Sequence, residues 1–190
     1  MRSGAIDTAA WLSLVSGHIR GLQGAAGRKQ QTLADASLSV WKTSTSGVGG
    51  DPRKTISYYV KGPVVGFVLE ARLRVASGGK HGLDEVMRRA FAKFGGERGF
   101  TPEQFEAIAA EVAGSDQKAF FERALRSTEE LDYQEALDWF GLSFAAVADD
   151  APKAQRWALR VREGVGDEQA AHLRAFLAPT PAAQPAATGK

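Results

Sequence analysis

The segment from Thr55 to Ala76 constrains the fold of this chain more than any other stretch. Its apolar residues recur at intervals of three and four, which predicts a helix with one buried face. These residues are Ile56, Tyr59, Val60, Val64, Phe67, Val68, Ala71 and Val75. Charged residues stand among them at positions 61, 70, 72 and 74, whereas a membrane span needs about 20 nearly uncharged residues. The segment therefore predicts a core helix rather than a membrane helix.

Proline at position 63 decides where this helix can begin. Proline has no N–H to donate to the carbonyl of residue 59, so the helix either starts with Pro63 in its first turn or bends at Pro63. In both cases Tyr58 and Tyr59 lie at the entrance of the helix. A phenol at such a position can face a cleft, which makes the two tyrosines the first candidates for a functional site.

The rest of the chain shows mostly helical spacing. The start at Thr101 is well defined, because a threonine cap, Pro102 and Gln104 together are typical of a capping box. Helices are predicted over 8–23, 33–41, 83–94, 101–112, 115–125 and 168–177, and a short piece at 133–139 leads to Gly141. Two short strands are predicted at 142–147 and 157–161. The fold class is therefore mainly α, with a small strand pair near the C-terminus.

Composition excludes several classes of function. The chain of 190 residues carries 24 Lys and Arg against 22 Asp and Glu, a formal charge of +2, and its basic residues are dispersed. We therefore expect no nucleic-acid partner and no membrane partner. The absence of cysteine excludes disulfides, thiol catalysis and thiolate metal sites. Residues 1–7 lack the apolar run of a signal peptide, so the expected location is cytoplasmic by default.

A series of short motifs resembles one peptidase family. Residues 56–62 read Ile-Ser-Tyr-Tyr-Val-Lys-Gly, which resembles the Tyr-x-Lys-Gly segment of the glycyl aminopeptidases. These are zinc peptidases of the gluzincin clan and cousins of aminopeptidase N. The resemblance covers about residues 10–147 and continues through Gly82–Arg88, Gly99–Pro102, Gly114–Asp116, Phe120–Phe121, Thr128–Tyr133 and Ala136–Leu142.

The resemblance implies a domain organisation. Residues 1–147 would form an orthogonal helical bundle like the C-terminal lobe of thermolysin-type peptidases, with a flexible loop at 43–52. A short remnant with a strand and a helix would follow at 148–177. The Pro/Ala/Thr-rich end of the chain, 178–190, is expected to be disordered by composition.

The resemblance also implies roles for four residues. Tyr59, two residues before Lys-Gly, would donate its hydroxyl to the oxyanion of the tetrahedral intermediate. Tyr58, Lys61 and Gly62 would bind the substrate. The alternative interpretation of Tyr59 is a core tyrosine at helical spacing.

The chain departs from the family in its metal site and in a second domain. A zinc peptidase of this type needs His-Glu-x-x-His on one helix and a downstream glutamate. His18, His81 and His172 have no glutamate beside them, so we expect no metal ligands and no cofactor in this chain, whereas complete family members hold zinc. The family usually carries a PDZ domain after the segment that ends at residue 142. Here only about ten residues separate the two predicted strands, far too few for such a domain, so we expect it to be lost.

Two functional hypotheses follow. The first is a truncated or split relative of a zinc metallo-aminopeptidase, inactive alone, which supplies the cleft wall and the oxyanion tyrosine. Its partner would be a zinc-bearing peptidase half or a second copy of itself, its substrate a peptide, and its location open to export as in the family. This hypothesis predicts an apolar surface around Trp41, Tyr58, Tyr59 and Val60. The second hypothesis is a non-catalytic helical protein-interaction module, and a fragment of a longer gene is a third explanation.

Overall fold

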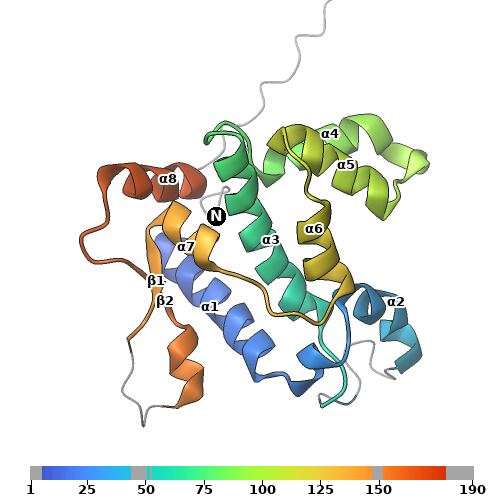
Figure 1. Ribbon diagram of the computed structural model, residues 1–190, viewed down its shortest axis with the longest axis horizontal. Helices are drawn as coiled ribbons and strands as arrows, with labels where there is room; N and C mark the ends of the chain where they lie inside the picture. Colours follow the sequence, from blue (N-terminus) through green and yellow to red (C-terminus); the bar gives the residue numbers. More distant parts are fainter. Residues whose placement is uncertain (1–5, 44–50, 52, 147–151, 179–190) are drawn as a thin grey trace, which may run out of the picture.

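The computed structural model describes residues 6–43, 51, 53–146 and 152–178, with the backbone alone at 41–43 and 153–154. The helices are α1 (Thr8–Gly24), α2 (Leu33–Thr43), α3 (Tyr58–Ala76), α4 (Leu83–Phe94), α5 (Pro102–Ala113), α6 (Lys118–Phe121), α7 (Gln134–Phe140) and α8 (Asp167–Leu177). Short 3₁₀ and π turns are η1 (Ala26–Lys29), η2 (Gly96–Arg98), η3 (Glu122–Arg126) and η4 (Lys153–Trp157). The strands β1 (Leu142–Phe144) and β2 (Leu159–Val161) form one small sheet. The predicted fold class, mainly α with a strand pair near the C-terminus, is confirmed (Figure 1).

The helix predicted from residues 55–76 is α3, and it runs through the middle of the molecule (Figure 1). It packs against α1, α2, α4, α5 and α7. A helix surrounded in this way is buried on most of its circumference, and even Lys61 and Glu70 are only 3 % exposed. The prediction of one buried face was therefore too narrow. It was wrong for Tyr59 and Val75, which are exposed near the two ends of the helix.

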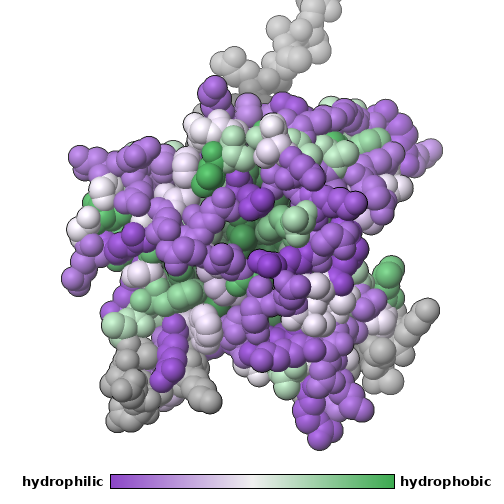
Figure 2. Space-filling view, in the orientation of Figure 1, coloured by the Kyte–Doolittle hydropathy of each residue, from purple (hydrophilic) through white to green (hydrophobic). Residues whose placement is uncertain are grey.

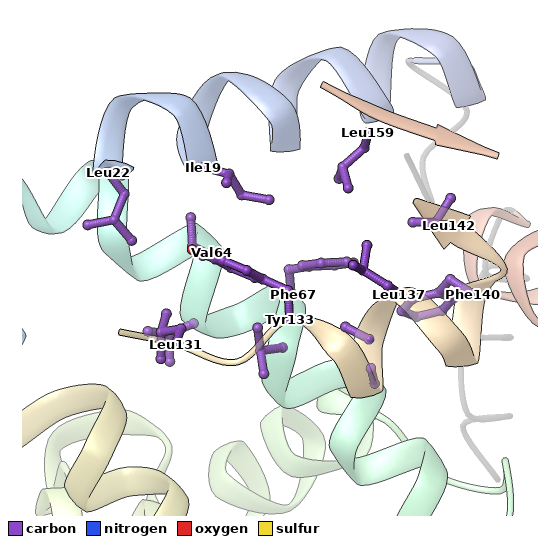
Figure 3. Packing of buried hydrophobic residues seen from close by; sticks show 14 of the residues in the cluster. Ile19, Leu22, Val64, Phe67, Leu131, Tyr133, Leu137, Phe140, Leu142 and Leu159 are labelled. Atoms are coloured by element: carbon purple, nitrogen blue, oxygen red, sulfur yellow. The ribbon is translucent and has the colours of Figure 1, made fainter. Parts of the chain in front are cut away.

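The larger core lies between α1, α3 and α7. Ile19 of α1 faces Val64 and Phe67 of α3 across this core (Figure 3). Phe140 of α7 is fully buried and stacks on Phe67 with ring centroids 6.0 Å apart. Burying one such phenylalanine contributes about 1.5–3 kcal/mol. On the other side Phe140 lies 5.0 Å from the ring of Phe176, so it also joins α8 to the core.

A second core lies under α4 and α5. Leu69 and Leu73 of α3 enter it, and Phe121 of α6 closes it. The residues that α4 and α5 contribute are Val86, Ala90, Ile108, Ala109, Val112 and Ala113. α3 therefore belongs to both cores, because it presents apolar residues on opposite faces.

The start of α3 decides between the two alternatives that Pro63 left open, a helix that begins near Pro63 or one that continues through it. Its first residue is Tyr58, its N-cap is Ser57, and the helix continues through Pro63. A start with Pro63 in the first turn is therefore wrong. The proline lies inside the helix and gives no N–H to the carbonyl of Tyr59. The position of both tyrosines at the entrance of the helix is confirmed.

The predicted capping box of α5 is confirmed. The Thr101 hydroxyl accepts from the Gln104 N–H at 3.3 Å, and the Gln104 side chain accepts from the Thr101 N–H at 2.8 Å. Gly114 ends the helix with a φ of +68°, a conformation that glycine adopts without steric cost.

The two strands pair antiparallel, with Ser143 opposite Arg160. They are shorter than predicted: β1 ends at Phe144, and β2 begins at Leu159, after Trp157 in η4. Residue 147 of the first predicted strand lies outside the described residues. The buried hydroxyl of Ser16 on α1 accepts from the Leu159 N–H at 2.8 Å and donates to the Leu12 carbonyl at 2.6 Å. One hydroxyl thus holds the sheet against the first helix.

The predicted loop at 43–52 and the predicted tail at 178–190 lie almost wholly outside the described residues. Of the predicted remnant at 148–177, Leu159 and Leu173 are buried in the larger core. Among the residues that the structure describes, we find no helix with the length and apolar character needed to cross a bilayer.

Candidate functional site

The chain that leads into α3 is held in place by η1 and by Gln31, which follows it. A Cβ on Gly27 would lie 2.1 Å from the Thr55 carbonyl oxygen, so the two backbones approach more closely than any side chain permits. The Ile56 N–H donates to the Gln31 side chain at 3.0 Å, and Ile56 itself is buried. The backbone at the start of α3 is therefore fixed before the first tyrosine.

Tyr58 and Tyr59 form a pair on this fixed backbone. Their ring centroids are 4.3 Å apart, with 35° between the ring planes. Tyr58 is half-buried and packs against the larger core, whereas Tyr59 is 58 % exposed. The interpretation of Tyr59 as a core tyrosine is therefore wrong.

The Tyr59 phenol also affects the titration of its neighbour. The interaction between the two side chains is the main cause that raises the pKa of Tyr58, and burial contributes less. The Tyr58 phenol therefore keeps its proton beside Tyr59 at neutral pH.

Lys61 points into the molecule behind the tyrosine pair. Its side chain is buried, and this burial lowers its pKa, an effect that the charge of Glu130 partly offsets. Glu130 accepts from Arg28 Nε at 2.9 Å and from Gln23 Nε2 at 3.1 Å. Lys61 makes no hydrogen bond or ion pair within the part of the chain that the structure describes. Among the described residues, Glu130 therefore provides the opposite charge that acts on Lys61.

The next turn of α3 borders a groove of about 340 Å³. Pro63 and Gly66 line it from α3, and His18 lines it from α1. Further lining residues come from α4 and α8. The sequence analysis missed this groove, although the glycines on either side of Pro63 are the signal for it. Gly62 has no atom within 4 Å of the place where its Cβ would stand, so this side of the helix is open.

The predicted apolar surface around Trp41, Tyr58, Tyr59 and Val60 is only partly placed. The side chain of Trp41 lies outside the described residues. Val60 is half-buried and packs on Gly21 of α1, where a Cβ would meet it at 3.3 Å. Of the predicted residues that the structure describes in full, Tyr59 is therefore the one that presents most of its surface.

The three histidines lie on different elements. His18 is on α1, and His81 follows α3. His172 of α8 stacks on Trp139 with ring centroids 3.7 Å apart, and its Nδ1 lies 3.2 Å from the Trp139 carbonyl oxygen. Within residues 6–146 and 152–178, as far as they are described, no three His, Asp or Glu side chains gather in a way that could hold a metal ion. The donor set of a zinc peptidase therefore does not fit on these residues.

Comparison with known proteins identifies one match. The family model of M61 glycyl aminopeptidase matches residues 1–65, about a third of the chain. The matched segment contains Tyr58, Tyr59, Lys61 and Gly62, and the resemblance to this family is confirmed there. The resemblance of residues 82–142 stays a prediction. No curated protein and no solved structure matches the chain.

Proposed function

We propose that this chain supplies one wall of the substrate cleft of a metallo-aminopeptidase, with Tyr59 as the donor to the oxyanion. One observation carries the proposal. An exposed phenol stands at the first turn of a deeply buried helix, within the segment that matches the glycyl aminopeptidase family. The substrate would be the N-terminal part of a peptide.

Tyr59 suits this role because its backbone is rigid and its side chain is exposed. The close contact between Gly27 and Thr55 fixes the chain three residues before the tyrosine pair. The Tyr58 ring packs against the Tyr59 ring with centroids 4.3 Å apart and so supports the position of the donor. A preorganised donor of this kind stabilises the negative charge that develops on the carbonyl oxygen when a nucleophile attacks the peptide bond.

Tyr58, Lys61 and Gly62 support the same site in different ways. Tyr58 packs against the ring of the donor, and Gly62 keeps the surface of α3 open beside it. Lys61 is a positioning residue in this proposal, because its buried side chain lies near Glu130 behind the pair. The groove at Pro63 and Gly66 would take a substrate side chain one helical turn from Tyr59.

The metal ligands and the general base would come from residues outside the described part of this chain. They would stand either elsewhere in a longer polypeptide or on a partner that carries His-Glu-x-x-His. The chain alone is expected to be inactive towards aminoacyl substrates.

The alternative function is a non-catalytic interaction module. The observation in its favour is the lack of a possible metal cluster among the described residues. In this case the exposed face of Tyr59 would contact another protein rather than a transition state.

A reconstitution experiment separates the two functions. The chain is mixed with a zinc-loaded N-terminal segment of a glycyl aminopeptidase, and hydrolysis of an aminoacyl p-nitroanilide is followed. We expect hydrolysis only when both segments are present. In the mixture, Tyr59→Phe should lower kcat by a factor of about 10²–10³ and leave KM nearly unchanged.

Tyr133→Phe is the matched control, since Tyr133 is a buried tyrosine that accepts a hydrogen bond from Gln23 at 3.2 Å. Its loss should lower stability by about 1 kcal/mol and leave kcat unchanged. Full kcat in Tyr59→Phe would refute the catalytic role, and binding of the two segments without any hydrolysis would favour the interaction module.

A further inference from the structure

We propose that a second pocket, between α3, α6 and α7, binds a free α-amino acid with a small apolar side chain. This Arg72 pocket has a volume of about 270 Å³, just below the range of about 300–1,000 Å³ typical of sites for drug-sized ligands. Figure 2 shows hydrophobic residues at the bottom of a hollow in the middle of this face, ringed by hydrophilic ones. In Figure 1 the same place lies at α3, between α6 on one side and α7 on the other.

Arg72 on α3 is held in a fixed orientation. Its Nε donates at 2.6 Å to the side-chain oxygen of Gln117, a residue that is 2 % exposed. The Gln117 amide nitrogen donates to the Ser115 hydroxyl at 3.0 Å and to the Ser115 carbonyl at 3.2 Å, which sets the orientation of the amide. The guanidinium carbon lies 5.7 Å from the centre of the Phe120 ring. The plane of the guanidinium is therefore fixed from two sides.

The terminal nitrogens of Arg72 are held much less tightly. Nη1 lies 3.4 Å from a carboxylate oxygen of Glu135, longer than the 2.7–2.9 Å of a good charge-assisted hydrogen bond. Both side chains keep about a third of their surface exposed. A guanidinium with its plane fixed and its ends loosely paired is suited to accept a ligand carboxylate in bidentate geometry.

The charges around the Arg72 pocket point to a ligand that carries both signs. Arg72 and Arg123 line it with positive charge, and Asp132 and Glu135 line it with negative charge. A simple anion would meet the two carboxylates, and a simple cation would meet the two guanidinium groups. An α-amino acid places a carboxylate and an ammonium group on one carbon, so each charge has a partner.

The remaining lining selects the side chain of the ligand. Val68 and Leu131 are buried at the pocket, and Phe120 forms a third apolar wall. The site is also distinct from the tyrosine pair. Arg72 stands 13 residues after Tyr59 on the same helix, and at 1.5 Å per residue this is about 20 Å along its axis. The binding of an amino acid here does not depend on the proposed peptidase role.

An NMR titration of the whole ¹⁵N-labelled chain tests the proposal with three probes of matched shape. L-Valine carries both charges, isovalerate the carboxylate alone and isobutylamine the ammonium alone. We expect saturable shifts around α6 and α7 with L-valine at a Kd of about 1 mM or below. Each single-charge probe should bind at least about tenfold more weakly, because it leaves one set of charged groups unpaired. No saturable shifts with L-valine, or equal binding of isovalerate, would overturn the proposal.

Variants locate the site. Arg72→Gln and Glu135→Gln should each weaken L-valine binding at least about tenfold, since each removes one charge partner. Arg160→Gln is the control, because Arg160 is an exposed arginine on β2 that does not line the pocket. L-Valine affinity that stays the same in both pocket variants would show that the charged network only ties the helices together. The three-probe comparison on the unaltered chain decides the matter if a variant fails to fold.

Discussion

Glu70 offers the sharpest test of how the second core is held in place. The residue is 3 % exposed, and its carboxylate accepts from the Leu83 N–H at 2.5 Å and from Arg74 Nε at 2.7 Å. The N-cap of α4 is Gly82, which has no side chain to satisfy the first N–H groups of that helix. A carboxylate from α3 therefore acts as the cap of α4 and meets the positive end of its dipole.

Two substitutions of Glu70 should differ in a defined way. Glu70→Ala removes two charge-assisted hydrogen bonds of a buried carboxylate and leaves the half-buried Leu83 N–H without this partner, a loss of about 3–5 kcal/mol in the free energy of unfolding. Glu70→Gln keeps an oxygen for the Leu83 N–H and loses the charge, so its cost should be about 1–2 kcal/mol. At about 2–4 °C per kcal/mol for a domain of this size, the melting temperature should fall by about 6–20 °C and 2–8 °C respectively.

Gly82→Ala supplies the control for this interpretation. A Cβ at position 82 would lie 2.6 Å from a Glu70 carboxylate oxygen, so it should displace the carboxylate from the cap. The substitution should destabilise the chain strongly when Glu70 is present and much less in a Glu70→Ala background, because neighbouring sites are not additive. Urea unfolding of the four variants, with hydrogen exchange at the Leu83 amide, measures both effects. A loss below about 1 kcal/mol for Glu70→Ala, or the same penalty for Gly82→Ala in both backgrounds, would refute the reasoning.

Three further predictions concern the start of α3 and the sheet. Gly27→Ala should destabilise the chain by about 2–4 kcal/mol, because its Cβ would overlap the Thr55 backbone, which cannot move aside as a side chain can. A melting curve like that of the unaltered chain would contradict this. Lys61→Met should stabilise the chain at pH 7, since burial lowers the pKa of Lys61 and disfavours its charge. At pH values between that lowered pKa and the ordinary 10.5, the unfolded state binds more protons than the folded state, so the unaltered chain gains stability as pH rises. The stability advantage of the variant should therefore shrink from pH 7 to 10.5, which urea unfolding at several pH values measures. Ser16→Ala should lower stability by about 1–3 kcal/mol through the orphaned Leu159 N–H, and unchanged hydrogen exchange at that amide would argue against it.

Local signals in the sequence were enough to place most helices. The capping box at Thr101 and the glycine at 114 act within a few residues, so the bounds of α5 followed from them. The burial of Lys61 and Glu70 could not be predicted in this way. Both are charged residues that periodicity treats as interruptions, and they are buried because five other helices surround α3.

In the candidate site, too, some features followed from local sequence signals and others arise only from tertiary packing. The place of Tyr58 and Tyr59 at the entrance of a helix followed from Pro63 and from the resemblance to the peptidase family. The groove beside them did not, because its walls come from α1, α4 and α8, which meet only in the folded chain.

The hydrogen bond between Ser16 and Leu159 has a consequence for the way the chain is made. The two residues are 143 positions apart, so α1 waits for most of the polypeptide before its partner strand exists. At about 5–20 residues per second, a ribosome needs roughly 7–29 s to bridge that interval. During this time α3 can already cover the side of α1 that carries Ile19, whereas the side that carries Ser16 stays without its strand. The two sides of one helix are therefore completed at different stages of synthesis.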